Sequence, residues 1–221
     1  MPTAIVNLLI VDDDPALRTS LSAILALFGH QVRSASDGFS ALAELRLEVP
    51  DIIVSDLNMP GMSGFEFLSV VRRRFPTIHV IAMSSQGAAG AVPLGVAADA
   101  FYQKGSGLGT LLQIVEAMAS AGEQQPSHSH SSIPAPIWVE QNEKTPSSVA
   151  YIMLTCPECL RTFPQYSADA PCPVHETRCT YCNNLFHYAI VQATFPAHRK
   201  ARGRKPIPRQ TPPELQVRES R

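Results

Sequence analysis

The sequence predicts an α/β protein with a doubly wound, five-stranded parallel sheet, followed by a disordered linker and a small β module. Over residues 5–121, short apolar runs alternate with longer segments whose apolar residues recur at helical spacing. The apolar runs are nearly continuous, as expected of strands buried on both faces of a parallel sheet. The second module is indicated by five cysteines, all of which follow residue 155.

The first predicted strand, residues 5–11, runs directly into three acidic residues and a proline, Asp12-Asp13-Asp14-Pro15. An aspartate followed by proline is typical of a helix start, so Asp14 is expected to cap a helix that ends at Gly29. Adjacent carboxylates repel one another unless a cation lies among them. Because Asp14 caps, Asp12 and Asp13 remain as a candidate functional pair.

The rest of this domain continues the alternation of strands and helices. Residues 86–97 are rich in alanine and glycine and contain a proline, so the fourth helix is expected to be short, irregular or mobile. The other expected strands are 31–35, 52–54, 78–83 and 100–103, and the other expected helices are 39–47, 65–75 and 108–121.

Five polar residues fall at or just after the carboxyl ends of predicted strands: Asp12, Asp13, Asp56, Ser84 and Lys104. Ligands of open α/β sheets bind in the crevice beyond these ends, so one site is expected to collect all five. Asp56 alone could equally cap the next helix, but the convergence favours chemistry. Three carboxylates form the oxygen-rich site that Mg²⁺ prefers. A cation and Lys104 could neutralise a phosphoryl group moving onto Asp56.

Residues 5–121 resemble the response regulator receiver family. The resemblance rests on the pair Asp12-Asp13, Asp56 in the context Asp-x-x-Met-Pro-Gly-Met-Ser-Gly, Ser84, Phe101 and Lys104. It implies the flavodoxin-like receiver fold and phosphoryl transfer to Asp56 from a sensor histidine kinase or a phosphotransfer protein. A receiver that no longer takes phosphate is the alternative.

The same resemblance implies that Mg²⁺ is held by Asp12, Asp13, Asp56 and the backbone carbonyl of Asn58. It also implies that Ser84 and Phe101 form a switch that alters the face made by the fourth helix, fifth strand and fifth helix. Two features depart from the family pattern. Gly105 replaces the usual proline after Lys104, which predicts a looser loop, and the Ala/Gly-rich fourth helix predicts a remodelled signalling face.

Composition divides the chain into a receiver-like domain at 1–121, a flexible linker at 122–149, a β module at 150–192 and a basic, disordered tail at 193–221. Residues 1–121 carry a net charge of −4 and residues 122–221 a net charge of +3, so different partners are expected. The linker is rich in Gln, Ser, His and Pro, but Ile137-Trp138-Val139 is an apolar island expected to dock on a folded domain. With no membrane span or signal peptide recognised, we interpret the protein as cytoplasmic.

Two Cys-x-x-Cys pairs, Cys156/Cys159 and Cys179/Cys182, are separated by nineteen residues. Each pair can form a knuckle that presents two thiolates, and two knuckles complete a tetrahedral Zn²⁺ site. A redox pair is the alternative, but cysteines in a cytoplasmic protein are more often ligands than disulfides. A module this small is expected to depend on the metal for its stability.

Residues 150–192 resemble a zinc ribbon, with flanking strands at 151–155 and 185–191. Asn183 follows the second knuckle and tolerates a left-handed backbone conformation, whereas Leu160 fits the equivalent place less well. Cys172 and His175 form a further Cys-x-x-His pair whose role stays open. Cys172 is interpreted as a loop residue that could replace a ligand, and His187 as a strand residue.

The tail contains six Lys/Arg and no acidic residue between 198 and 209. Such a run is usually a solvated end. Arg202-Gly203-Arg204-Lys205-Pro206 nevertheless resembles an AT-hook core with Lys205 inserted, so Arg202, Arg204 and Lys205 are candidate nucleic-acid contacts.

Two functions follow as hypotheses. In the first, phosphorylation of Asp56 controls a DNA-binding output made by the zinc-ribbon module and tail, and the protein regulates transcription. In the second, it is a phosphorelay or adaptor protein whose ribbon contacts other proteins. Neither requires an enzyme beyond self-catalysed phosphoryl transfer and dephosphorylation, and a phosphorylation-dependent homodimer is left open.

Overall fold

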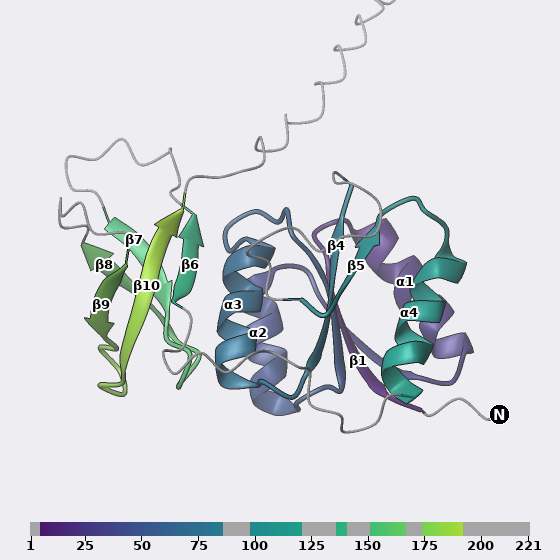
Figure 1. Cartoon of the computed structure of the whole chain (residues 1–221), viewed down its shortest axis with the longest axis horizontal. Helices are drawn as coiled ribbons and strands as arrows, with labels where there is room; N and C mark the ends of the chain where they lie inside the picture. The colour runs from purple at the N-terminus through teal and green to yellow at the C-terminus, as the bar shows by residue number, and fades with distance from the viewer. Residues whose placement is uncertain (1–4, 86–97, 121–135, 141–150, 167–173, 192–221) are drawn as a thin grey trace, which may run out of the picture.

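A computed structural model describes residues 5–85, 98–120, 136–140, 151–166 and 174–191 (Figure 1). The first part of the chain alternates strands with helices, as expected. Its strands are β1 (Asn7–Val11), β2 (Gln31–Ala35), β3 (Ile52–Asp56), β4 (His79–Ser84) and β5 (Ala100–Gln103). Its helices are α1 (Pro15–Leu27), α2 (Gly38–Leu47), α3 (Gly64–Arg74) and α4 (Leu108–Ser120). The helix predicted within 86–97 lies outside the described residues.

The five strands form one parallel sheet in the order β2-β1-β3-β4-β5. This is the flavodoxin-like order of a doubly wound sheet, so the predicted fold class is confirmed. Helices α2 and α3 cover one face of the sheet, and α1 and α4 cover the other (Figure 1). Successive strand residues serve opposite faces: Leu8 and Ile10 pack with the α1/α4 side, and Leu9 and Val11 pack with the α2/α3 side.

Polar side chains cap the starts of α1 and α3, and the cap predicted at Asp14 is confirmed. Asp14 accepts hydrogen bonds from the N–H groups of Ala16 and Leu17 at 2.8 and 3.3 Å. Ser63 caps α3 in the same way, by accepting a hydrogen bond from the N–H of Glu66 at 3.3 Å. These caps fix where α1 and α3 begin relative to the strands that precede them.

The second part of the chain contains β6 (Ile137–Glu140), β7 (Tyr151–Thr155), β8 (Thr162–Tyr166), β9 (His175–Arg178) and β10 (Leu185–Val191). Strands β6, β10 and β9 form one sheet, in which β6 runs parallel and β9 antiparallel to β10, while β7 and β8 form an antiparallel pair. Phe163 and Phe186 meet edge to face between the two sheets, with ring centroids 6.2 Å apart. The strands expected at 151–155 and 185–191 are present.

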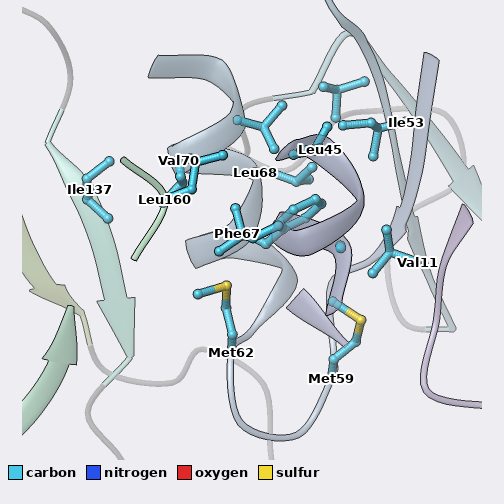
Figure 2. Packing of buried hydrophobic residues seen from close by; sticks show 14 of the residues in the cluster. Val11, Leu45, Ile53, Met59, Met62, Phe67, Leu68, Val70, Ile137 and Leu160 are labelled. Atoms are coloured by element: carbon cyan, nitrogen blue, oxygen red, sulfur yellow. The ribbon is translucent and has the colours of Figure 1, made fainter. Parts of the chain in front are cut away.

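The apolar island Ile137-Trp138-Val139 belongs to β6, a strand inside the range predicted to be a flexible linker. Ile137 and Val139 are buried, and they share one hydrophobic cluster with α3 residues such as Phe67 and Val70 (Figure 2). The N–H of Trp138 also donates to Oγ of Ser69 in α3 at 3.2 Å. The island therefore joins the sheet of the second module and packs against the receiver-like domain at the same time.

Candidate functional site

The acidic residues lie at one end of the parallel sheet, at the carboxyl ends of β1 and its neighbour β3, and β4 separates β3 from β5. Asp12 and Asp13 follow β1, Asp56 is the last residue of β3, and Lys104 follows β5. Asp12 and Asp56 are buried, at 0% and 2% exposure, whereas Asp13 is exposed. Ser84, the last residue of β4, lies between β3 and β5, so all five residues that the strand-end argument selected lie at this end of the sheet.

Lys104 is the centre of the charge arrangement. Its Nζ lies 2.8 Å from Oδ2 of Asp12 and 2.7 Å from Oδ2 of Asp56. Burial works to lower the pKa of Lys104, but hydrogen bonds and charge from Asp12 and Asp56 outweigh it and raise the pKa. Lys104 is therefore a cation at neutral pH.

Asp56 is held in a less favourable environment for its charge. Burial raises the pKa of the Asp56 carboxyl, and the opposing effects of Lys104 and of the N–H of Asn58 do not fully compensate. That N–H donates to Oδ1 of Asp56 at 3.2 Å. A positive charge added beside Asp56 would favour its ionised form.

The donor set fits a hard divalent cation. Asp12, Asp13 and Asp56 each offer a carboxylate oxygen, and these atoms lie within 4.8 Å of one another. Mg²⁺ prefers oxygen ligands and keeps several of its bound waters. The three carboxylates supply such ligands, and the site is open to water at Asp13, which is exposed. Asn58 lies beside this cluster, as its contact with Asp56 shows, and the role of its carbonyl stays a prediction.

The two candidate switch residues occupy neighbouring strands. Ser84 ends β4, is fully buried, and its Oγ lies 3.4 Å from Nδ2 of Asn58, which donates to it. The carbonyl of Ser84 accepts the N–H of Lys104 at 2.9 Å, so it helps to position the lysine. Phe101 lies in β5, is 8% exposed, and belongs to the cluster on the α2/α3 side.

The loop after Lys104 has a shape that the usual proline could not adopt. Gly105 has a φ of 92° and Gly107 a φ of 97°. Proline is fixed near −65°, so the replacement of proline by glycine changes the path of this loop. Even so, Lys104 reaches both carboxylates.

Sequence reasoning missed two residues that shape the acidic site. Nη1 of Arg18 donates to the carbonyl of Asp12 at 2.5 Å from one turn inside α1. Gly64 passes so close to β3 that a Cβ there would lie 2.0 Å from the carbonyl oxygen of Asp56. The signals were an arginine four residues after the capping aspartate and a glycine that closes the turn after Asp56.

The second candidate site is the group of four cysteines. Sγ of Cys156 lies 3.6 Å from Sγ of Cys182, and Sγ of Cys159 lies 3.6 Å from Sγ of Cys179. Tetrahedral Zn–S bonds of about 2.3 Å place sulfur atoms about 3.8 Å apart, so this spacing fits a tetrahedral Zn²⁺ site. All four Sγ atoms lie within 4.8 Å of one another.

Backbone amides favour thiolates at the second knuckle. Burial works to raise the pKa of Cys179, but the N–H groups of Cys182 and Tyr181, with the neighbouring thiols, lower it to about 7. Burial raises the pKa of Cys156 in the first knuckle. A cation among the four sulfur atoms would offset that cost.

The other metal-ligand candidates do not join the cysteine group in the described part of the chain. His175 stacks on Tyr188 at 5.1 Å between ring centroids, and Nε2 of His187 lies 3.4 Å from Oε2 of Glu176. In the β9–β10 ladder His175 and His187 fall on opposite faces, and His187 is a strand residue as predicted. Cys172 and the tail residues Arg202, Arg204 and Lys205 lie outside the described residues.

Comparison with known proteins places the first domain in a family. The family model of the response regulator receiver domain matches residues 8–116, and this part of the chain is a receiver domain. The match does not extend to the four-cysteine module.

Each match covers only part of this chain, and the matches to the two curated relatives cover only part of those proteins as well. The response regulator protein FleR of Pseudomonas aeruginosa is 41% identical over 82 residues, covering 37% of this chain and 17% of its own. The probable transcriptional regulatory protein TcrX of Mycobacterium tuberculosis is 36% identical over 83 residues, covering 38% and 36%. The solved structure of Vibrio cholerae chemotaxis protein CheY4 has 30% identity and a TM-score of 0.48, and covers 52% of this chain and 99% of its own. This chain thus spans well under two thirds of the two curated relatives.

In the described residues, no helix is long and apolar enough to cross a membrane.

As the pH is lowered, the affinity for Mg²⁺ is expected to begin falling at a higher pH than it would if all the ligand carboxylates had ordinary pKa values. Because the pKa of Asp56 is raised, protons compete for that ligand at a higher pH. Titration calorimetry with Mg²⁺ at successively lower pH, starting from about pH 7, should show a loss of affinity that begins above the ordinary titration range of an aspartate. Asp13→Asn should weaken binding at neutral pH at least about tenfold, since loss of even an outer-shell partner costs about 10–100-fold.

The matched control is Asp51→Asn, which removes an exposed carboxylate from the opposite end of β3. Its affinity should equal that of the wild type. An affinity that stays constant over the same pH range would contradict the assignment of Asp56 as a ligand.

Proposed function

We propose that the protein is a two-component response regulator in which Asp56 accepts a phosphoryl group from a sensor histidine kinase or a phosphotransfer protein. The observation that carries the proposal is the pairing of Lys104 with both Asp12 and Asp56, with Asp13 beside them. This arrangement offers a nucleophile, a fixed cation and a carboxylate site for Mg²⁺. Bound Mg²⁺ would neutralise charge on the phosphoryl oxygens.

In the reaction, one carboxylate oxygen of Asp56 forms a bond to phosphorus as the bond from phosphorus to the donor nitrogen of a phosphohistidine breaks. The electron pair stays on the imidazole, which takes up a proton. Lys104 opposes the effect of burial on the pKa of Asp56 and is positioned to contact a phosphoryl oxygen. Because Lys104 is also paired with Asp12, it stays close to Asp56 when Asp56 is modified.

Ser84 and Phe101 are proposed to respond to the phosphoryl group. The hydroxyl of Ser84 now accepts a hydrogen bond from Nδ2 of Asn58, and phosphoryl oxygens on Asp56 would be strong acceptors to which the same hydroxyl could donate. Movement of Ser84 at the end of β4 would change the surroundings of Phe101 in the adjacent strand β5. We propose no further enzymatic activity beyond this phosphoryl transfer and the loss of phosphate by hydrolysis.

Phosphorylation can be tested with a small acyl phosphate and Mg²⁺, followed by intact-mass measurement. The wild type should gain one phosphoryl group, and Asp56→Asn should gain none. Asp51→Asn, which keeps the acidic site, should be labelled like the wild type. Labelling of Asp56→Asn to the wild-type extent would remove the proposal.

The four cysteines are proposed to bind a structural Zn²⁺ ion in a zinc-ribbon-like module. The sulfur spacing and the two knuckle amides that favour Cys179 as thiolate support this assignment. The site is built from four thiols and leaves no open position for a substrate, which is typical of structural rather than catalytic zinc.

For output we propose transcriptional regulation through DNA contact by the C-terminal region, in a cytoplasmic protein. The relative TcrX is described as a probable transcriptional regulatory protein, and the sequence of the tail supplies arginine and lysine residues suited to phosphate contacts. The full chain should bind duplex DNA at low salt, and replacement of Arg202, Arg204 and Lys205 by alanine should weaken binding and reduce its salt dependence. Absence of binding at low salt would reject this output.

One observation favours the adaptor function instead. The outer face of the β7–β8 pair exposes Tyr151, Met153 and Tyr166, and Tyr151 lies directly opposite Tyr166 in the ladder. Exposed aromatic side chains on one face suit contact with a protein partner. If the chain binds no DNA, this face is the proposed route of output.

A further inference from the structure

The two cysteine knuckles share one backbone shape but differ at one position. In each knuckle the N–H of the first cysteine donates to the carbonyl five residues later, at 2.9 to 3.0 Å. The residue four positions after that cysteine donates back to its carbonyl at 2.9 Å and has a left-handed conformation. That residue is Leu160 in the first knuckle, with a φ of 55°, and Asn183 in the second, with a φ of 61°.

Leucine is a poor choice for this conformation, because its Cβ approaches the following carbonyl, whereas asparagine tolerates it. The surroundings explain the difference. Asn183 is exposed to solvent, but Leu160 is only 5% exposed and belongs to a hydrophobic cluster that runs from the receiver domain into the second module. Figure 2 shows Leu160 beside Val70 of α3, with Ile137 of β6 close by.

Polar contacts fix the same knuckle to both helices. The carbonyl of Leu160 accepts a hydrogen bond from Nη2 of Arg46 in α2. Oε1 of Glu158, inside the knuckle, lies 3.6 Å from Nη2 of Arg74 at the end of α3. The first knuckle and β6 thus meet α2 and α3 through apolar and polar contacts together.

We propose that the first cysteine knuckle is a docking element for its own receiver domain, through which metal bound to the four cysteines stabilises α2 and α3. The inference rests on the proposed Zn²⁺ site and not on phosphoryl transfer. Metal fixes Cys156 and Cys159, which holds Leu160 in its left-handed conformation against α3. Without metal, Leu160 can relax to an ordinary conformation and its side chain leaves the cluster.

Binding energies linked in this way are reciprocal. If the metal stabilises the docked state, docking must also strengthen metal binding by the same factor. Met59 and Met62, in the loop between Asp56 and α3, belong to the same extended cluster as Leu160, on the α2/α3 side of the sheet. Metal occupancy would therefore act on the side of the receiver that carries Asp56's loop, and would leave the α1/α4 side untouched.

The test measures zinc affinity by competition with a chromophoric chelator and amide hydrogen exchange of Val70 and Val71 in the full chain. In the wild type, chelation should speed exchange of these buried α3 amides about tenfold or more, as for a helix that loses a packed layer. Leu160→Asn gives the first knuckle the residue of the second. This variant should bind zinc, yet the amides of Val70 and Val71 should exchange quickly both with and without metal.

Two further variants keep the result interpretable. Asn183→Leu places a leucine at the equivalent exposed position, so zinc affinity should fall while zinc-saturated protein keeps wild-type exchange in α3. Arg46→Gln leaves the four cysteines in place but removes a receiver contact to the knuckle, so it should speed α3 exchange and, by the same reciprocity, lower zinc affinity.

The outcomes separate the two proposals. A wild-type chain that binds no zinc would reject the metal site and the docking device with it. Two other outcomes would reject only the docking role of the knuckle. In one, the wild type binds zinc but chelation does not change the amide exchange of Val70 and Val71. In the other, zinc-loaded Leu160→Asn protects these amides as well as the wild type does.

Discussion

Gly64→Ala is expected to destabilise the receiver domain by about 3 kcal/mol or more, the upper end of the cost of overpacking a core. A Cβ at residue 64 would lie 2.0 Å from the carbonyl oxygen of Asp56 and 2.6 Å from Cα of Leu57. Both are backbone atoms, so β3 or the start of α3 must move. Because Asp56 ends β3, the same movement should weaken Mg²⁺ binding. Urea unfolding of the full chain measures the first effect and Mg²⁺ titration the second.

Gly109→Ala is the matched control. Gly109 lies in α4, and nothing lies within 4 Å of the position where its Cβ would stand. Alanine is favoured over glycine in helices, so the free energy of unfolding should change by no more than about 1 kcal/mol, toward greater stability. Equal unfolding midpoints for Gly64→Ala and the wild type would show that the close approach to Asp56 is not required.

Cys156→Ser is expected to abolish zinc binding at neutral pH and to unfold the module formed by β7 to β10. Cys156 is fully buried and supplies one of four thiolates, and apparent zinc binding energies of such sites reach about 10–16 kcal/mol. The apolar core between the two sheets is small, with Phe163 and Phe186 as its largest members, so it cannot replace that energy. Amide NMR spectra should lose the dispersed signals of residues 151–166 and 174–191.

Thr180→Ser provides the control within the second knuckle, because Thr180 is exposed and is not a ligand. It should retain zinc and the dispersed signals. A Cys156→Ser chain whose module stays folded after treatment with a chelator would show that the metal is not needed for the fold.

Periodicity and strand-end chemistry predicted most of the receiver domain. The continuous apolar runs around Leu9 and Ile53 identify buried parallel strands, and their order along the chain determines which polar residues meet. Asp12, Asp56 and Lys104 could be grouped before any geometry was known, because each follows a strand whose carboxyl end lies at the same edge. The distances between them, and the raised pKa of Asp56, depend on packing that no local pattern records.

The second module was predicted less completely, for reasons that particular residues make clear. No strand was predicted at β8, which contains Pro164; β8 lies at the edge of a two-stranded sheet, where a missing N–H is tolerated. The polar sequence His175–Arg178 concealed β9, which is only partly buried. Residues 137–139 were recognised as an apolar island, but their pairing with β10, some fifty residues later, could not be read from the sequence.

Leu160 was the most informative misfit. From sequence it looked like a poor residue for the end of a knuckle, and the structure confirms the left-handed conformation that makes it so. Its burial against the receiver domain supplies the reason, which depends on residues as distant in the chain as Arg46, 114 positions earlier. A local rule is broken here because a long-range contact compensates for it.

The central claim is that Asp56 is the phosphoacceptor, and chemical trapping tests it most directly. The full chain is incubated with an acyl phosphate and Mg²⁺, the aspartyl phosphate is reduced with borohydride, and the modified residue is located by peptide sequencing in a mass spectrometer. We expect the reduced residue to be Asp56, with Asp12, Asp13 and Asp51 unmodified. A modification at any of those three residues, with Asp56 intact, would contradict the account.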